Sequence, residues 1–105
     1  MESQPGNPYD FHGGVFTFNV DTAELDDDEL KNALFNAVGW AKDDLTIDMA
    51  LSTYISSRTI GQLIDAAAGL RYRGKRLTVV ARPKVALMLK RTGFDRLATL
   101  VTAEL

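Results

Sequence analysis

Hydrophobic and polar residues alternate with two different periods along the chain, and each period predicts one kind of element. A period of two over residues 15–20 predicts a strand that follows the short run Tyr9–His12. Gly13 and Gly14 separate the two runs, and glycine supplies the positive φ that a tight hairpin requires. The chain is therefore predicted to open with a β-hairpin.

Three longer stretches carry the period of 3.6 residues that is typical of amphipathic helices. The first is predicted to start after Asp26, an N-cap residue with Glu29 in the capping-box position, and to end near Trp40. The second is predicted over Ser57–Tyr72. The third is predicted over residues 83–92, where a proline stands in the first turn and a glycine follows the last.

Short β-branched runs between these helices predict the remaining strands. They cover residues 45–49 and Leu77–Ala81, and a short helical turn with a last strand near residues 99–101 completes the chain. Strands that alternate with helices after a hairpin predict an α/β fold, with a small mixed β-sheet, parallel later strands and about three to four helices. In such sheets, sites form beyond the carboxyl ends of the strands, so residues 50–58 are the expected functional loop.

Length and composition suit one domain. The chain has 105 residues, enough for a single hydrophobic core. Residues 1–8 contain two prolines and a glycine and are expected to form a flexible tail, with the domain over residues 9–105. Cysteine is absent, no apolar run reaches the length of a membrane span, and no secretion signal is recognisable. We therefore expect a cytoplasmic protein without membrane insertion.

The charges are unevenly distributed, although the net charge is only −2. Residues 1–57 carry two basic and eleven acidic residues, whereas residues 58–105 carry ten basic and three acidic residues. A basic cluster at the end of the second predicted helix is a candidate for nucleic-acid binding. Its members are Arg71, Arg73, Lys75 and Arg76, with Tyr72, Arg82 and Lys84 nearby. Because the helix dipole favours cations at a helix C-terminus, a structural role is the simpler interpretation, and we expect no nucleic-acid partner.

The residues needed for common enzyme chemistry are missing or isolated. His12 is the only histidine, and there is no cysteine and no G-x-S-x-G motif. One histidine without cysteine cannot fill a closed zinc site, and the phosphate-binding glycine motifs are absent. Asp48 lacks the further carboxylates of a Mg²⁺-dependent phosphoacceptor site, so it is expected to pair with a cation or to lie exposed at its strand end. We expect no enzyme activity, no metal and no cofactor.

Hydroxyl groups are concentrated before the second predicted helix, at Ser56, Ser57 and Thr59. A helix N-terminus has unpaired backbone N–H groups, so it can hold a capping serine, an anion, or a phosphate attached to a serine. These three roles remain open at this point.

The order of features from Leu45 onward resembles the STAS domain family, which includes the anti-sigma factor antagonists. The features in matching positions are residues 45–49, residues 54–57, Gly61, residues 73–77, Pro83, Val85 and residues 89–94. The opening hairpin and the capped first helix fit as well, so the resemblance extends over about residues 9–103. It implies a STAS-like fold in a single-domain protein.

The loop of that family typically reads Ile-Asp-Ser-Ser-Gly, and its first serine is phosphorylated by a partner serine kinase that is also an anti-sigma factor. In this chain that serine is Ser57, with Ser56 as the alternative, while Ser56, Arg58 and Thr59 replace the family's Asp, second Ser and Gly. The resemblance implies a non-enzymatic phosphoprotein, monomeric or weakly dimeric, in bacterial signal transduction by partner switching, with such a kinase and a serine phosphatase as partners. The expected contact residues are Tyr54, Ser56, Ser57, Arg58, Thr59 and Gln62.

Two alternatives stay open. The domain could be an unphosphorylated scaffold, or a subunit of a larger signalling or transport assembly. It could also be a small-ligand-binding or hydrolytic enzyme that uses the same loop, which would require a concave pocket and a base near Ser57.

Overall fold

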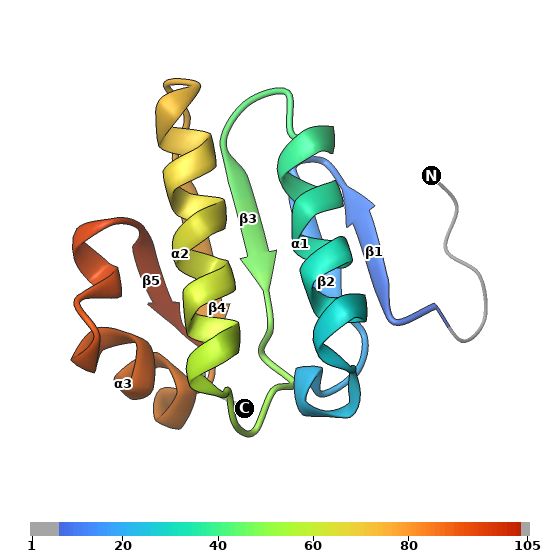
Figure 1. The fold of residues 1–105 in the computed structure, drawn as a ribbon, viewed down its shortest axis with the longest axis vertical. Helices are drawn as coiled ribbons and strands as arrows, with labels where there is room; N and C mark the ends of the chain where they lie inside the picture. Colours follow the sequence, from blue (N-terminus) through green and yellow to red (C-terminus); the bar gives the residue numbers. More distant parts are fainter. Residues whose placement is uncertain (1–6, 104–105) are drawn as a thin grey trace.

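The helices and strands follow the predicted order in the computed structural model, which describes residues 7–103 (Figure 1). Its main elements are β1 (Tyr9–His12), β2 (Val15–Phe18), α1 (Asp27–Trp40), β3 (Leu45–Asp48), α2 (Ser57–Tyr72), β4 (Leu77–Ala81), α3 (Pro83–Arg91) and β5 (Thr99–Thr102). Two 3₁₀ turns, η1 (Thr22–Glu24) and η2 (Phe94–Arg96), precede α1 and β5.

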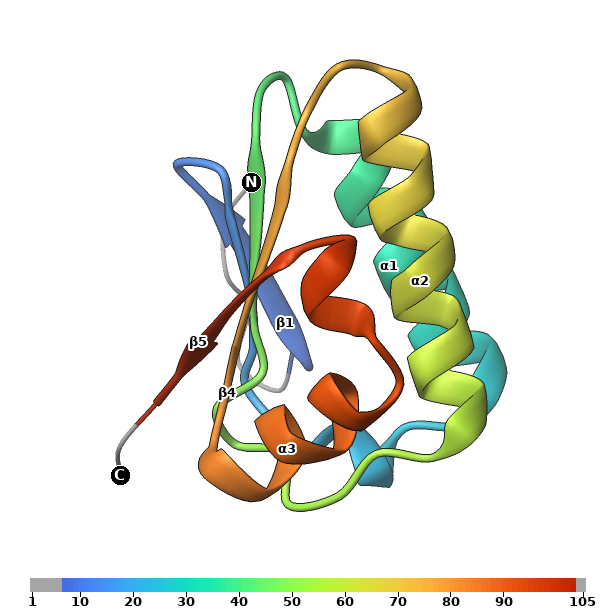
Figure 2. The same ribbon diagram turned by 90° about the vertical axis from the view of Figure 1, so that its left-hand side faces the viewer.

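The strands form one sheet in the order β1-β2-β3-β4-β5. β1 is antiparallel to β2, and all other neighbouring strands are parallel. Seen from the side, α1, α2 and α3 lie on the same face of the sheet (Figure 2). The predicted mixed α/β fold is confirmed, with three α-helices in the described residues. The carboxyl ends of β2, β3 and β4 meet at one edge of the sheet.

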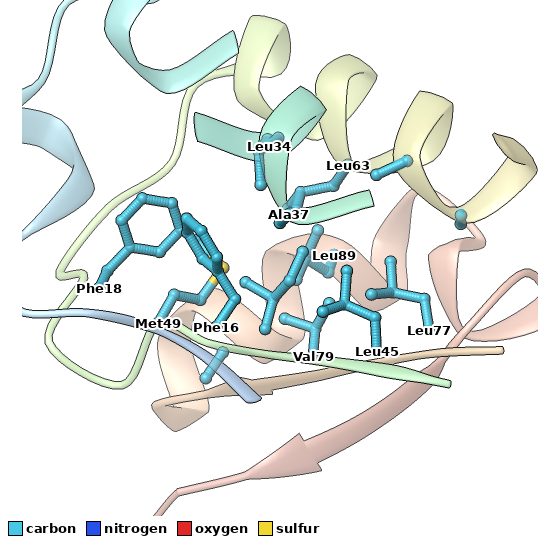
Figure 3. Close-up of a cluster of buried hydrophobic side chains, with 14 of the residues drawn as sticks. Phe16, Phe18, Leu34, Ala37, Leu45, Met49, Leu63, Leu77, Val79 and Leu89 are labelled. Atoms are coloured by element: carbon cyan, nitrogen blue, oxygen red, sulfur yellow. The ribbon is translucent and has the colours of Figure 1, made fainter. Parts of the chain in front are cut away.

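The core lies between the sheet and its helical layer (Figure 3). Phe16, Ile47 and Val79 are fully buried, and they lie beside one another on three neighbouring strands. Leu63 of α2 and Leu89 of α3 are equally buried above them. Since side chains alternate between the faces of a strand, this burial fixes the register of the sheet.

The opening hairpin forms as predicted, but its second strand is shorter. Gly13 and Gly14 have φ values of 59° and 80°, the left-handed conformations that suit a two-residue hairpin turn. The strand was predicted over residues 15–20, yet it ends at Phe18, because that residue pairs with Tyr9, the first residue of β1.

The segment before β1 is described only at residues 7 and 8. The carbonyl of Asn7 accepts a hydrogen bond from the side chain of Asn19 (3.4 Å), and the carbonyl of Pro8 accepts one from the Asn19 backbone (2.8 Å). Residues 1–6 of the predicted tail lie outside the described residues, as do residues 104 and 105.

The helix boundaries agree with the capping signals. Asp26 accepts a hydrogen bond from the backbone of Glu29 (2.8 Å), and the Glu29 side chain accepts one from the backbone of Asp26 (3.3 Å), which completes the predicted capping box. α2 covers the predicted Ser57–Tyr72. α3 ends at Arg91, one residue early, and Gly93 follows in the left-handed conformation expected of a glycine cap (φ 81°).

The two remaining strand boundaries differ from the prediction by one residue each. β3 ends at Asp48, although the backbone N–H of Met49 still donates to the carbonyl of Val80 (2.9 Å). β5 extends to Thr102, which lies opposite Ala81 at the end of β4. The predicted short turn of helix before β5 is the 3₁₀ turn η2.

Two residues of the basic cluster join the end of α2 to the end of α1. Arg73 donates from Nη1 to the carbonyl of Val38 (2.8 Å) and from Nη2 to that of Ala41 (3.3 Å), and Lys75 donates to the same Ala41 carbonyl (3.2 Å). The last carbonyls of a helix have no partner within the helix, so these cations satisfy them and balance the negative end of the dipole. The contacts support the structural interpretation of the cluster.

We expect Arg73→Ala to lower the free energy of unfolding by about 1–2 kcal/mol, because it removes charge-assisted hydrogen bonds to α1. Arg71→Ala is the matched control, since Arg71 is exposed at the same end of α2 and has no side-chain hydrogen bond among the described residues. Its effect should stay below about 0.5 kcal/mol. Urea denaturation followed by circular dichroism measures both values, and equal losses would contradict a specific role for Arg73.

Candidate functional site

We refer to the loop of residues 49–56, between β3 and α2, as the serine loop. It starts at the carboxyl end of β3, at the edge of the sheet where β2 leads into α1 and β4 leads into α3. In Figure 1 it runs along the bottom of the molecule to the first turn of α2. The loop therefore lies where the topology predicts a site.

Asp21, three residues after β2, holds the serine loop from one side. Its Oδ2 accepts hydrogen bonds from the backbone N–H (3.2 Å) and the hydroxyl of Thr53, and its Oδ1 accepts one from the backbone of Ala23 (3.0 Å). Partial burial acts to raise the pKa of Asp21, but these hydrogen bonds and the charge of Arg82 outweigh it, so the pKa lies below the ordinary value of 3.8. Asp21 is thus a carboxylate at neutral pH.

A buried pair of hydroxyl groups supports the loop from below. Ser52 is fully buried, and its Oγ accepts a hydrogen bond from the backbone of Thr22 (3.2 Å) and lies 2.8 Å from the Thr22 hydroxyl. A buried hydroxyl without a partner costs about 1–3 kcal/mol. The Ser52–Thr22 pair therefore joins the serine loop to the β2–α1 connection.

Residues of β3 and of the β4–α3 connection hold the start of the loop. The side chain of Asp48 accepts a hydrogen bond from the backbone of Ala50 (3.0 Å), and Arg82 donates from Nε to the carbonyl of Ala50 (3.1 Å). Asp48 is half-buried and forms no ion pair among the described residues. The prediction that it pairs with a cation or lies exposed is wrong, because its carboxylate instead satisfies a loop backbone group.

Ser56 and Ser57 have different environments. Ser56 is the N-cap of α2, and its Oγ accepts a hydrogen bond from the backbone of Thr59 (3.1 Å) and lies 3.1 Å from the Thr59 hydroxyl. Ser57 is the first residue of the helix, its side chain is exposed, and its hydroxyl has no hydrogen bond within residues 7–103. The capping role therefore belongs to Ser56, and the hydroxyl of Ser57 faces solvent.

The other predicted contact residues are partly exposed and partly buried. Tyr54 is 54% exposed, and the exposed Arg58 forms an ion pair with Asp27 of α1. Gln62 is half-buried, and its Nε2 lies 3.5 Å from the carbonyl of Asp27. Thr59 is only 6% exposed, so it supports the N-cap from below and is not part of the surface.

The surface around the loop carries both hydrophobic and charged side chains. Leu51 adds a second exposed hydrophobic side chain near Tyr54 in sequence. An open hollow of about 580 Å³ lies between the first turns of α1 and α2, and charged residues such as Lys31 and Arg58 line it. Exposed aromatic residues and arginine beside polar groups are typical of protein interfaces.

His12 and Ser57 lie at opposite ends of the sheet. His12 is opposite Val15 at the start of β2, and Val15 is beside Thr46 near the start of β3, whereas Ser57 follows the end of β3. His12 is therefore not positioned to act as a base for Ser57. Within residues 7–103, no three metal-binding side chains are grouped. In the same range, no helix has the length and apolar character to cross a membrane.

Sequence reasoning missed Asp21, Ser52 and Thr53 as residues of the site. The available signal was an aspartate at a strand end, where its side chain often accepts hydrogen bonds from nearby backbone. The missing information was strand order: β2 and β3 are parallel neighbours, so their carboxyl ends and the following loops meet. The residues next to Asp21 in sequence do not indicate that β2 pairs with β3.

Comparison with known proteins supports the fold and identifies the family. The family model described as "Mlab, STAS domain" matches residues 19–102. The crystal structure of TM1081 from Thermotoga maritima, proposed as an anti-sigma factor antagonist, is similar with a TM-score of 0.70 and 16% identity, covering 91% of this chain and 86% of that chain. The NMR structure of TM1081 is similar with a TM-score of 0.71 and 18% identity, covering 91% of this chain and 80% of that chain.

A third similar structure is RsbS of Moorella thermoacetica, in a variant with a serine-to-glutamate substitution. Its TM-score is 0.64 at 18% identity, with 93% of this chain and 90% of that chain covered. The chain matches no curated protein at the level of sequence. At these identities the structural similarities show the fold, while the family match spans all three helices and the serine loop. The predicted resemblance is thereby confirmed, and the chain belongs to the STAS domain family.

Proposed function

We propose that the chain is a regulatory protein-interaction domain of the anti-sigma factor antagonist type and not an enzyme. Its partner is a serine kinase that acts as an anti-sigma factor. This kinase binds the serine loop and the first turns of α2. Phosphorylation of Ser57 weakens this contact, and a serine phosphatase restores it. The proposed contact residues are Leu51, Tyr54, Ser56, Ser57, Arg58 and Gln62, without the buried Thr59.

The division of roles between the two serines carries this proposal. Ser56 has its Oγ engaged by the backbone of Thr59, so modification there would remove the N-cap of α2. Ser57 is exposed and its hydroxyl has no hydrogen bond within the described residues, so a kinase could reach it without disturbing the fold. The geometry favours Ser57 over Ser56 as the phosphoacceptor.

The electrostatics of the helix start fit a switch that changes binding but not folding. A phosphate adds about 1.5–2 negative charges, which the N–H groups and dipole of a helix N-terminus tolerate. Arg58, the next residue, is an additional cation. A partner that covers the loop would instead have to desolvate the phosphate, and a loss of about 3 kcal/mol weakens a complex more than 100-fold.

The scaffold interpretation is the second candidate, and the sequence of the loop favours it. The family's acidic residue before the phosphoacceptor is replaced by Ser56, and Arg58 is already paired with Asp27. A kinase that reads the acidic residue would lose this contact. In that case the loop binds its partner constitutively, and neither Ser57→Ala nor Ser57→Asp changes binding.

We expect incubation with the cognate serine kinase and ATP to place one phosphate on Ser57, detected by tandem mass spectrometry. Ser57→Ala should abolish this phosphate and change the free energy of unfolding by less than about 0.5 kcal/mol. Ser57→Asp should weaken binding of the kinase in a titration calorimetry experiment, because it places a negative charge in the interface.

Ser56→Ala is the matched control for this experiment. It should lower the free energy of unfolding by about 1 kcal/mol through loss of the N-cap, while Ser57 remains phosphorylated. Unmodified Ser57 in the presence of an active cognate kinase would exclude the switch and leave the scaffold interpretation.

The Asp21 contacts predict a pH-dependent effect on stability. Asp21→Asn should lower the free energy of unfolding by about 1–2 kcal/mol at neutral pH, because an amide cannot accept all of the hydrogen bonds that Thr53 and Ala23 donate. Since the pKa of Asp21 is lowered in the folded state, its stabilising contribution is complete above the ordinary value of 3.8 and is lost as the pH falls through the lowered pKa.

Denaturation of wild type and Asp21→Asn over a range of pH tests this prediction. The difference between the two proteins should shrink only below about pH 4. A difference that is constant down to the acid transition would show that the charge of Asp21 does not stabilise the serine loop.

A further inference from the structure

Phe35, in the middle of α1, has 78% of its surface exposed. It borders a groove of about 340 Å³ between α1 and α2, which Gln62, one of the proposed kinase contact residues, also lines. The floor of the groove is apolar, with Leu34 and Val38 from α1 and Ala66 and Gly69 from α2. A large exposed aromatic side chain beside an apolar groove is a frequent sign of a protein interface.

Both helices lie on the outer side of the molecule, and no other described element covers them (Figure 2). They run side by side in the same direction (Figure 1). Ala66 and Gly69 of α2 line the same groove as Phe35. Because their side chains are small, they leave space beside Phe35. The groove can therefore accept a bulky side chain from outside.

The charges on the two helices occur in opposite order. Along α1, Asp27 comes before Lys31, whereas along α2, Arg58 comes before Asp65. Asp27 and Arg58 form an ion pair at the first level, which is the first turn of each helix. Lys31 and Asp65 border the groove at the next level, one to two turns further along. Beside the groove, α1 thus presents a cation and α2 an anion.

We propose that this face binds a second copy of the chain about a two-fold axis parallel to the helices. Rotation about that axis places α1 of each copy over α2 of the other at the same level. Phe35 then enters the partner's groove over the small residues, and Lys31 faces Asp65 of the partner subunit. A two-fold axis perpendicular to the helices would place α1 against α1, so Phe35 would not meet Ala66 and Gly69 of the partner subunit.

The size of this face predicts a weak dimer. α1 has 14 residues, which corresponds to about 21 Å, and two packed helices are about 20 Å wide. The face is therefore smaller than the roughly 800 Å² per partner of a standard interface. Surface charges contribute little to affinity but select the orientation of the partners. Phe35 should therefore supply most of the binding free energy, and Lys31 and Asp65 should set the orientation of the two copies.

Sedimentation equilibrium from about 1 µM to about 1 mM tests the proposal, because weak dimers dissociate in this range. Wild type should show a concentration-dependent dimer, and Phe35→Ser should raise the dissociation constant at least about tenfold. Leu87→Ser is the matched control, since Leu87 is 49% exposed on α3, and it should leave the dimer unchanged. Thermal unfolding of each variant confirms that the fold is retained.

A charge exchange tests the predicted orientation. Lys31→Glu and Asp65→Lys should each weaken self-association about fivefold, because each creates two contacts between like charges. An equimolar mixture of the two variants should recover the dimer, since both contacts in the mixed pair then join opposite charges. The loss in each variant together with the recovery in the mixture distinguishes α1 over α2 from α1 over α1.

Three results would overturn the proposal. They are a wild-type protein that stays monomeric up to about 1 mM, a dimer that persists in Phe35→Ser, and a mixture of the two charge variants that dimerises no better than either alone.

Discussion

The buried polar groups beyond the carboxyl ends of β2, β3 and β4 must form hydrogen bonds with one another. The position of the serine loop depends on this constraint. A loop that crosses an edge of the core cannot leave its buried hydroxyl and N–H groups without partners. Ser52 is fully buried and is paired with Thr22, and Asp21 accepts two hydrogen bonds from Thr53. Because these bonds join segments about 30 residues apart, they fix the loop relative to the whole fold.

Different residues hold the loop in place and face solvent. Ser52 and Thr59 are buried, and together with Asp21 they hold the backbone, whereas Tyr54 and Ser57 are exposed on the outer side. A preformed loop loses little conformational entropy when a partner binds, which favours recognition by a rigid surface. A charge added at Ser57 would then act on the partner more than on the domain.

Local signals in the sequence were enough to predict most of the fold. The capping box at Asp26, the two glycines of the hairpin and the periodicity of α2 each depend on residues close together in the chain, and the structure confirms all three. The support of the candidate site could not be predicted in the same way. The bonds of Asp21 to Thr53 and of Asp48 to Ala50 depend on strand order and on the path of the loop.

The same distinction applies to single residues of the loop. A serine before a helix is recognisable as a cap, but only the structure assigns that role to Ser56 and leaves Ser57 exposed. Thr59 was expected on the contact surface, yet it is buried because its hydroxyl lies against the capping serine. Sequence predicts the type of site, and the packing beneath it decides which side chains remain available.

We expect the serine loop to be held in place before any partner binds. Amide hydrogen exchange of the free protein, resolved by NMR, tests it most directly at Thr53, whose N–H donates to Asp21. We expect exchange at least about 100-fold slower than in an unstructured peptide, because the loop must open before this N–H is released. Exchange of the Thr53 amide at the rate of an unstructured peptide would contradict it.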